Sequence, residues 1–180
     1  MNLGFLVKFR SLLSSGSLTI GSRPNMRYWP RLRWEQGKIV IGDRIWTRCG
    51  IVIDAQSGEI KIGNDVSIND YSVLLGHGGI TIGNNVRIAA HVAISSFEHV
   101  YDDSAVQIRH QGITKAAVII EDDVWIGAGT KVLAGSHIAH GCVVGANSVV
   151  KGKTVPFGVY VGAPARLVKS RTDHGGRQVS

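Results

Sequence analysis

Apolar side chains recur at every sixth position along much of this 180-residue chain. This spacing fits neither an amphipathic helix, whose apolar positions recur every three or four residues, nor a strand that alternates every two. It fits short strands joined by tight corners, with three strands to a coil of about 18 residues. The positions that carry the pattern are Ile62, Ile68, Leu74, Ile82, Ile88, Ile94, Ile120, Ile126, Val132, Ile138, Val144 and Val150.

A longer repeat accompanies the six-residue one. Its sign is a series of Ile-Gly pairs, which begin at positions 20, 41, 62 and 82. Such a fixed period is typical of a solenoid, in which each coil buries its apolar row only when a neighbouring coil stacks on it. Glycine follows the leading aliphatic residue at positions 63, 83, 127 and 145. We expect these glycines to supply the backbone angles that a corner demands.

The pattern divides the chain into one β-solenoid domain over residues 18–169 and two ends. Residues 1–17 form an N-terminal helical or capping segment, with a helix expected over 2–14, and residues 170–180 form a flexible polar tail. The hexads stop after position 99 and resume at 118, so an insert occupies about 100–117. A loop of this length in so regular a fold is usually a lid or a binding loop.

The composition indicates where in the cell we expect the protein to be. Its two cysteines, Cys49 and Cys142, lie far apart, so the sequence predicts neither a disulfide framework nor a zinc pattern. The apolar N-terminal stretch is short and broken by Lys8 and Arg10, and no run is long enough to span a bilayer. We therefore expect a cytoplasmic protein.

The formal net charge of +7 is concentrated in the first coils, which also contain aromatic residues. The favoured interpretation is a solvated outer face. An alternative is a surface that meets anionic lipid at the inner face of the membrane, or a phosphorylated acceptor tethered there. No nucleic-acid-binding motif is present. The residues concerned are Arg23, Arg27, Arg31, Arg33, Arg44 and Arg48, with Tyr28, Trp29 and Trp34 between them.

Three motifs carry a resemblance to a known family: Trp125-Ile126-Gly127-Ala128, the run from Val144 to Val150, and Val161-Gly162-Ala163-Pro164-Ala165-Arg166. Together with the position of the insert, they make residues 38–169 resemble the hexapeptide-repeat O-acetyltransferases, with the galactoside, maltose and polysaccharide enzymes as the most similar branch. The resemblance implies an all-β fold, a left-handed parallel β-helix, and a homotrimer with active sites between subunits.

The resemblance also implies a catalytic residue. His99 is the last residue before the insert, where this family carries its catalytic histidine. A neutral imidazole can remove the proton of a sugar hydroxyl as that hydroxyl attacks a thioester. The alternative is an ordinary surface histidine. Glu98 and Asp102 are nearby carboxylates that could orient the ring.

For the acceptor, Asn69 matches a family asparagine that holds the substrate, although it could equally be a corner residue that bonds its own backbone. His77 lies about one coil before His99 and is a second candidate. The family often has an acidic residue near this position, and its absence here puts a galactoside or maltose substrate in doubt.

For the donor, the resemblance implies acetyl-CoA along the later coils. Trp125 matches a cofactor-contacting tryptophan, and Ala128 and Ala146 match small residues that let the pantetheine arm approach the backbone. Basic residues suit the CoA phosphates. Those basic residues are Lys151, Arg166 and Lys169.

The sequence thus predicts an acetyl-CoA-dependent O-acetyltransferase acting on a sugar hydroxyl in surface polysaccharide biosynthesis, by direct transfer that needs no metal. One alternative is an N-acetyltransferase for a nucleotide-linked amino sugar, which shares the fold, donor and histidine. A zinc hydratase on the same fold would need three converging imidazoles, which the histidine spacing disfavours. A non-catalytic scaffold is disfavoured by His99 and the donor motifs.

Overall fold

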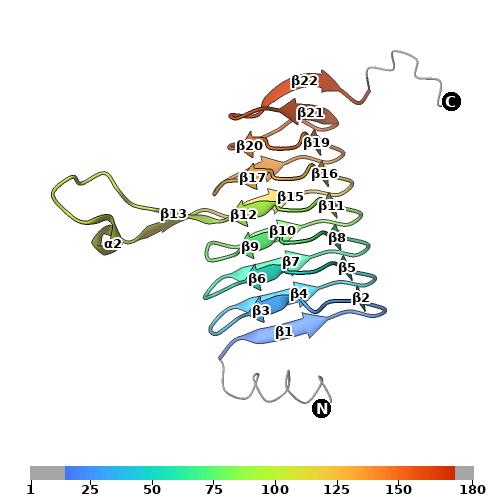
Figure 1. Cartoon of the computed structure of the whole chain (residues 1–180), viewed down its shortest axis with the longest axis horizontal. Helices are drawn as coiled ribbons and strands as arrows, with labels where there is room; N and C mark the ends of the chain where they lie inside the picture. The colour runs from blue at the N-terminus through green and yellow to red at the C-terminus, as the bar shows by residue number, and fades with distance from the viewer. Residues whose placement is uncertain (1–14, 173–180) are drawn as a thin grey trace.

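The structure is a computed structural model that describes residues 15–172. Three parallel sheets enclose one apolar core, and each coil gives one strand to each sheet (Figure 1). The first sheet contains β1 (Ser17–Ile20), β4 (Lys38–Ile41), β7 (Glu59–Ile62), β10 (Ile80–Ile82), β15 (Val118–Ile120) and β18 (His137–Ile138). The second contains β2 (Asn25–Met26), β5 (Trp46–Thr47), β8 (Ser67–Ile68), β11 (Arg87–Ile88), β16 (Trp125–Ile126), β19 (Val143–Val144), β21 (Gly158–Val161) and β22 (Arg166–Ser170). The third contains β3 (Arg31–Arg33), β6 (Val52–Asp54), β9 (Val73–Leu75), β12 (Ala93–Ser95), β17 (Lys131–Val132) and β20 (Val149–Val150).

The six-residue period corresponds directly to the stacking of the coils. On the second sheet, Ile68, Ile88 and Ile126 are register partners on adjacent strands, and each side chain is fully buried. The other two sheets repeat the pattern, for example where Leu74 pairs with Ile94. Residues about 20 apart in sequence therefore lie side by side, which confirms the predicted solenoid.

The sheets meet at three corners, which we number by chain order: the first corner joins the first and second sheets, the second corner joins the second and third, and the third corner joins the third and first. The predicted role of the glycines at positions 63, 83, 127 and 145 is wrong, because none of the four has a positive φ. Gly63 does not have a positive φ; the left-handed conformation falls two residues later, at Asp65 with φ 56°. A Cβ on Gly63 would instead stand 2.6 Å from the carbonyl oxygen of Gly83 in the next coil. Glycine is needed there for close stacking of the coils.

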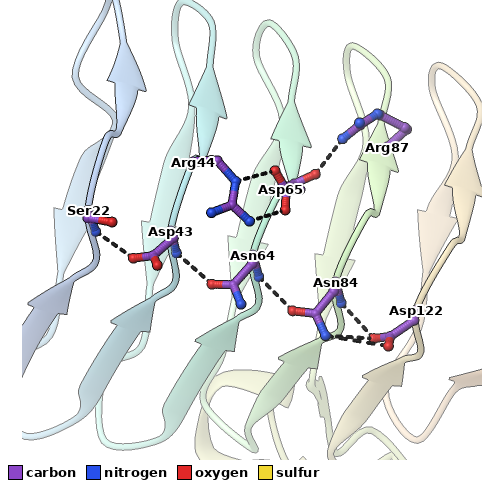
Figure 2. A network of polar contacts seen from close by, with 8 residues as sticks. All are labelled: Ser22, Asp43, Arg44, Asn64, Asp65, Asn84, Arg87 and Asp122. Carbon is purple, nitrogen blue, oxygen red and sulfur yellow. Dashed lines mark hydrogen bonds and ion pairs between the residues drawn. The ribbon is translucent and has the colours of Figure 1, made fainter.

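The first corner carries a ladder of polar side chains that links successive coils (Figure 2). The Oδ1 atoms of Asp43, Asn64, Asn84 and Asp122 each accept a hydrogen bond from the backbone N–H of the preceding member, at 2.6 Å, 2.7 Å, 2.9 Å and 2.6 Å, and the ladder starts at the N–H of Ser22. These bonds satisfy corner amides that no strand can pair.

An arm leaves the stack between the fourth and fifth coils, at the third corner, and projects from the side of the column (Figure 1). It consists of β13 (Phe97–His99), α2 (Ile108–Gln111) and β14 (Ile113–Lys115), with β13 and β14 paired antiparallel. The hairpin at the base of the arm therefore begins at Phe97, before the insert that was expected at 100–117. The β10–β15, β11–β16 and β12–β17 pairs run across the interruption, so the solenoid is continuous beneath the arm.

At the C-terminal end, β21 and β22 pair antiparallel and end the regular stacking. The expected helix over 2–14 and the tail beyond residue 172 lie outside the described residues. Within residues 15–172, no helix is long and apolar enough to cross a membrane.

Candidate active site

His99 stands on the arm, whose base is fixed to the coil beneath it. The buried Ser96 donates a hydrogen bond to the carbonyl of Leu75 at 3.0 Å and accepts one from the N–H of Gly78 at 2.8 Å. On the other strand of the arm, Lys115 Nζ donates to the hydroxyl of Ser57 at 3.1 Å. His99 itself is exposed and lies opposite Ile113 in the hairpin.

A short aromatic stack connects His99 to the third corner. The ring of Phe97 lies flat on the ring of His77, with centroids 4.1 Å apart and an interplanar angle of 4°. Phe97 then meets His99 edge-on, with centroids 6.1 Å apart. The structure therefore brings together the two histidines predicted from sequence, through Phe97, whose role sequence reasoning missed. The sequence did contain a signal for the role of Phe97. It lies two positions before His99, and residues two apart in a strand point to the same side.

The surroundings of His77 favour its neutral form. Burial lowers the pKa of His77 because it penalises the charged imidazolium, and Lys115 lowers it further, while Asp54 acts in the opposite direction. Asp54 is itself buried and paired with Arg33 at 3.3 Å. A neutral ring stacks on Phe97 and can still exchange a hydrogen bond with a ligand.

The two carboxylates that could orient His99 do not do so in this structure. Within residues 15–172, the His99 imidazole has the ring contact with Phe97 and no hydrogen-bond partner, so neither Glu98 nor Asp102 holds it. The ring is accessible, and aromatic packing rather than a hydrogen bond fixes its place.

Asn69, the other predicted acceptor residue, lies at the second corner rather than the third. Its Nδ2 donates to the carbonyl of Ile88 in the next coil at 2.8 Å, and not to its own backbone as the structural alternative had it. Its Oδ1 has no partner among residues 15–172, so one polar atom is left for a ligand.

The predicted donor residues gather around the second sheet and the second corner, with one exception. Trp125 is 55% exposed on the outer face of the second sheet, and the register column Trp125, Val143, Val159 ends at Lys169. Ala128 and Ala146 are exposed at the second corner, in successive coils. Arg166 begins β22 opposite Val161. The exception is Lys151, which follows β20 toward the third corner.

One chain therefore divides the predicted site between two corners. His77 and His99 belong to the third corner, whereas Asn69, Ala128 and Ala146 belong to the second, with the whole third sheet between them.

Two further histidines have structural partners. His137 Nε2 lies 2.6 Å from a carboxylate oxygen of Glu121, and the backbone N–H of His140 donates to the other oxygen at 2.7 Å. The bond from His137 is the main reason why the pKa of Glu121 is lowered. Among residues 15–172, no group of three or more His, Cys, Asp or Glu side chains is placed to hold a metal ion.

Comparisons with known proteins agree with this architecture. Residues 117–152 match the family model described as bacterial transferase hexapeptide (six repeats). A probable acetyltransferase of Mycobacterium tuberculosis is 35% identical over 162 residues, which cover 89% of this chain and 52% of that protein, so the chain spans about half the length of this relative. The Escherichia coli protein WbbJ, named provisionally as a lipopolysaccharide biosynthesis O-acetyl transferase, is 35% identical over 141 residues, or 74% of this chain and 72% of that protein.

Among solved structures, AntD of Bacillus cereus, an N-acyltransferase crystallised with dTDP and coenzyme A, matches with a TM-score of 0.69. The match covers 93% of this chain and 90% of AntD at 20% identity, and at that identity it shows the fold alone. The likeness confirms the left-handed parallel β-helix that the family resemblance implied. With these matches across most of its length, the chain belongs to the hexapeptide-repeat acetyltransferase family.

Proposed function

We propose that this protein transfers the acetyl group of acetyl-CoA to a hydroxyl of a sugar acceptor in surface polysaccharide biosynthesis. The observation that carries the proposal is the accessible imidazole of His99, held by the stack with Phe97 and His77 where the solenoid is interrupted. The relation to WbbJ supports O-transfer to a glycan.

In this mechanism, His99 is the general base. A sugar hydroxyl is a poor nucleophile, and removing its proton as it attacks the thioester carbonyl contributes about 10²–10⁴-fold to the rate. The neutral His77, half-buried beneath Phe97, supports the ring system and offers a polar edge to the acceptor. No covalent enzyme intermediate is required, because both substrates can meet in one cleft.

Acetyl-CoA supplies the activated acyl group, and the exposed residues of the second sheet are suited to hold it. Trp125 offers an aromatic surface, and Ala128 and Ala146 leave the corner backbone open to a narrow ligand arm. Arg166 and Lys169 are exposed at the end of the same sheet and suit phosphate groups. Lys151 lies toward the third corner, so it could contact only a donor bound there and not one bound along the second sheet.

The division of the site between two corners supports a homotrimer. The third-corner histidines of one copy and the second-corner residues of another would then form one site, with Asn69 Oδ1 directed to the acceptor. The arm carries His99 beyond its own coil, which suits contact with a neighbouring copy (Figure 1). Closed cyclic symmetry makes every such site equivalent.

The test compares His99→Ala with His110→Ala, which removes another exposed histidine of the same arm from α2. Thiol release from acetyl-CoA is measured over a panel of glycans and sugar nucleotides. We expect release to fall about 10²–10⁴-fold in His99→Ala, with acetyl-CoA binding retained, and to stay near normal in His110→Ala. Equal activity in both variants would remove His99 from the mechanism.

The same panel separates the second candidate, N-acetyl transfer to a nucleotide-linked amino sugar. A dTDP-4-amino-4,6-dideoxy-D-glucose acyltransferase of Escherichia coli, which is 32% identical over 139 residues that cover 74% of this chain and 72% of that protein, supports this candidate. An amino sugar as the best acceptor would establish it, whereas a hydroxyl acceptor without an amine would exclude it.

A further inference from the structure

A hollow on the outer face of the second sheet has no part in the site described above. It has a volume of about 390 Å³ and spans the coils that carry β5, β8 and β11. Its lining combines cationic, acidic, aromatic, apolar and hydroxyl groups: Arg44, Trp46, Asp65, Val66, Ser67 and Arg87.

Its charges are unevenly paired (Figure 2). The carboxylate of Asp65 is engaged by Arg44, which donates through both Nε and a terminal nitrogen, the first at 2.7 Å. Arg87 donates to the backbone carbonyls of Asp65 and Val86 and acts on the Asp65 carboxylate through its charge, but it forms no ion pair with a carboxylate among residues 15–172. One aspartate therefore faces two arginines, and the excess positive charge belongs to Arg87.

The surroundings add to this charge. Arg23, at the same corner one coil earlier, is exposed and also acts on the Asp65 carboxylate. Arg48 lies over the Trp46 ring, 4.8 Å from its centroid. The nearby Asp43 carboxylate is occupied in the corner ladder by the Ser22 N–H. The hollow thus presents guanidinium donors next to the half-buried indole of Trp46.

The hollow also adjoins the face proposed to hold the donor. Arg87 and Trp125 are register partners on the adjacent strands β11 and β16. A ligand in the hollow would therefore lie along the same sheet as a donor over the later coils, on the N-terminal side of it.

We propose that this hollow binds the phosphate of a phosphorylated sugar acceptor, and this inference rests on the acetyl transfer proposed above. Planar guanidinium groups bind phosphate oxygens through directed, charge-assisted hydrogen bonds. The part of the Trp46 indole that lines the hollow, away from the face covered by Arg48, provides an apolar surface for the ring of the attached sugar. Arg87 supplies the charge, and Arg44, already committed to Asp65, fixes the wall of the hollow.

The test is a calorimetric titration with inorganic pyrophosphate at low salt, with and without coenzyme A. The variant is Arg87→Gln, and the matched control is Arg31→Gln, which removes the same charge from an exposed position on the third sheet. We expect binding to weaken about 10- to 100-fold in Arg87→Gln and to change little in Arg31→Gln. Arg87→Lys, which keeps the charge without the planar fork, should lie between the two.

Two results would overturn the proposal. An equal loss of affinity in Arg31→Gln would mean that pyrophosphate binding depends on the net charge of the protein and not on the hollow. Displacement of pyrophosphate by coenzyme A would mean that pyrophosphate binds where the phosphates of coenzyme A bind. Thermal unfolding of each variant checks that the fold is intact, and because Arg87 is exposed we expect little change.

The source of the phosphate is identified by repeating the titration with UDP-glucose and with a short-chain alkyl diphosphate sugar. A preference for either that depends on Arg87 supports the hollow and names the class of acceptor. His99→Ala should bind pyrophosphate as the unmodified protein does. Failure of acetyl transfer with intact, Arg87-dependent binding would therefore count against the proposed reaction and leave the site standing.

Discussion

At the scale of single residues, stability depends on how completely each apolar position is enclosed by the coils on either side. Ile88 is fully buried between Ile68 and Ile126, whereas Ile119 is 40% exposed on the outer face of the first sheet. The same residue type thus occupies both environments within a few coils.

We expect Ile88→Ala to lower the free energy of unfolding by about 2–5 kcal/mol, because it leaves a cavity between two coils that cannot close on it. Ile119→Ala is the matched control and should change it by about 0.5 kcal/mol or less. Denaturant unfolding followed by circular dichroism gives both values. Similar losses in the two variants would contradict the inward assignment of the six-residue period.

At the scale of elements, the arm is an addition to the solenoid rather than part of its framework. The strands before and after it pair directly with each other, as where Ile80 is the register partner of Val118. The arm's own contacts are the hairpin, the Ser96 bonds and the Lys115 contact with Ser57.

Replacing residues 101–111 by Asn-Gly should therefore leave the β-helix folded, with an unchanged circular dichroism spectrum. The dipeptide favours a tight hairpin turn and keeps β13 and β14 joined. Acetyl transfer should fall about 100-fold, because the shortened turn follows directly after β13 and shifts His99 at its end, and a shift of about 1 Å in a catalytic group costs that much. Loss of the β-helix would show that the arm is structural, and retained transfer would show that its outer part is dispensable.

At the scale of the whole molecule, the third-corner histidines are separated from the second-corner alanines. We therefore predict that each active site is shared between two copies of the chain. His99→Ala removes the proposed base, and Ala128→Trp blocks the open corner proposed for the donor. Each variant alone should be inactive.

Co-expression of the two variants should restore activity if each site uses two copies. With random mixing, about a quarter of the sites would combine an intact His99 with an intact Ala128. Thiol release measured on the mixed oligomer, against each variant alone, gives the answer. No recovery in oligomers shown to contain both variants would mean that each chain carries a whole site.

The sequence alone determined the architecture of this protein. Hydrophobic burial at every sixth position requires short strands and stacked coils, and the place where the hexads stop marks the arm, because both are consequences of local spacing. The candidates His77 and His99 also came from the sequence: the family resemblance pointed to His99 at the end of the hexads, and His77 lies about one coil earlier.

Only the tertiary structure decided what the corners bring together. Three features depend on contacts between residues about 20 positions apart: the stack of His77 on Phe97, the placement of Asn69 and Ala128 away from His99, and an Arg87 guanidinium that forms no ion pair within residues 15–172. The left-handed backbone at Asp65, expected at Gly63, depends in the same way on how closely neighbouring coils approach. A period specifies that coils stack, but side chains outside the core are not repeated, so their neighbours follow only from the folded arrangement.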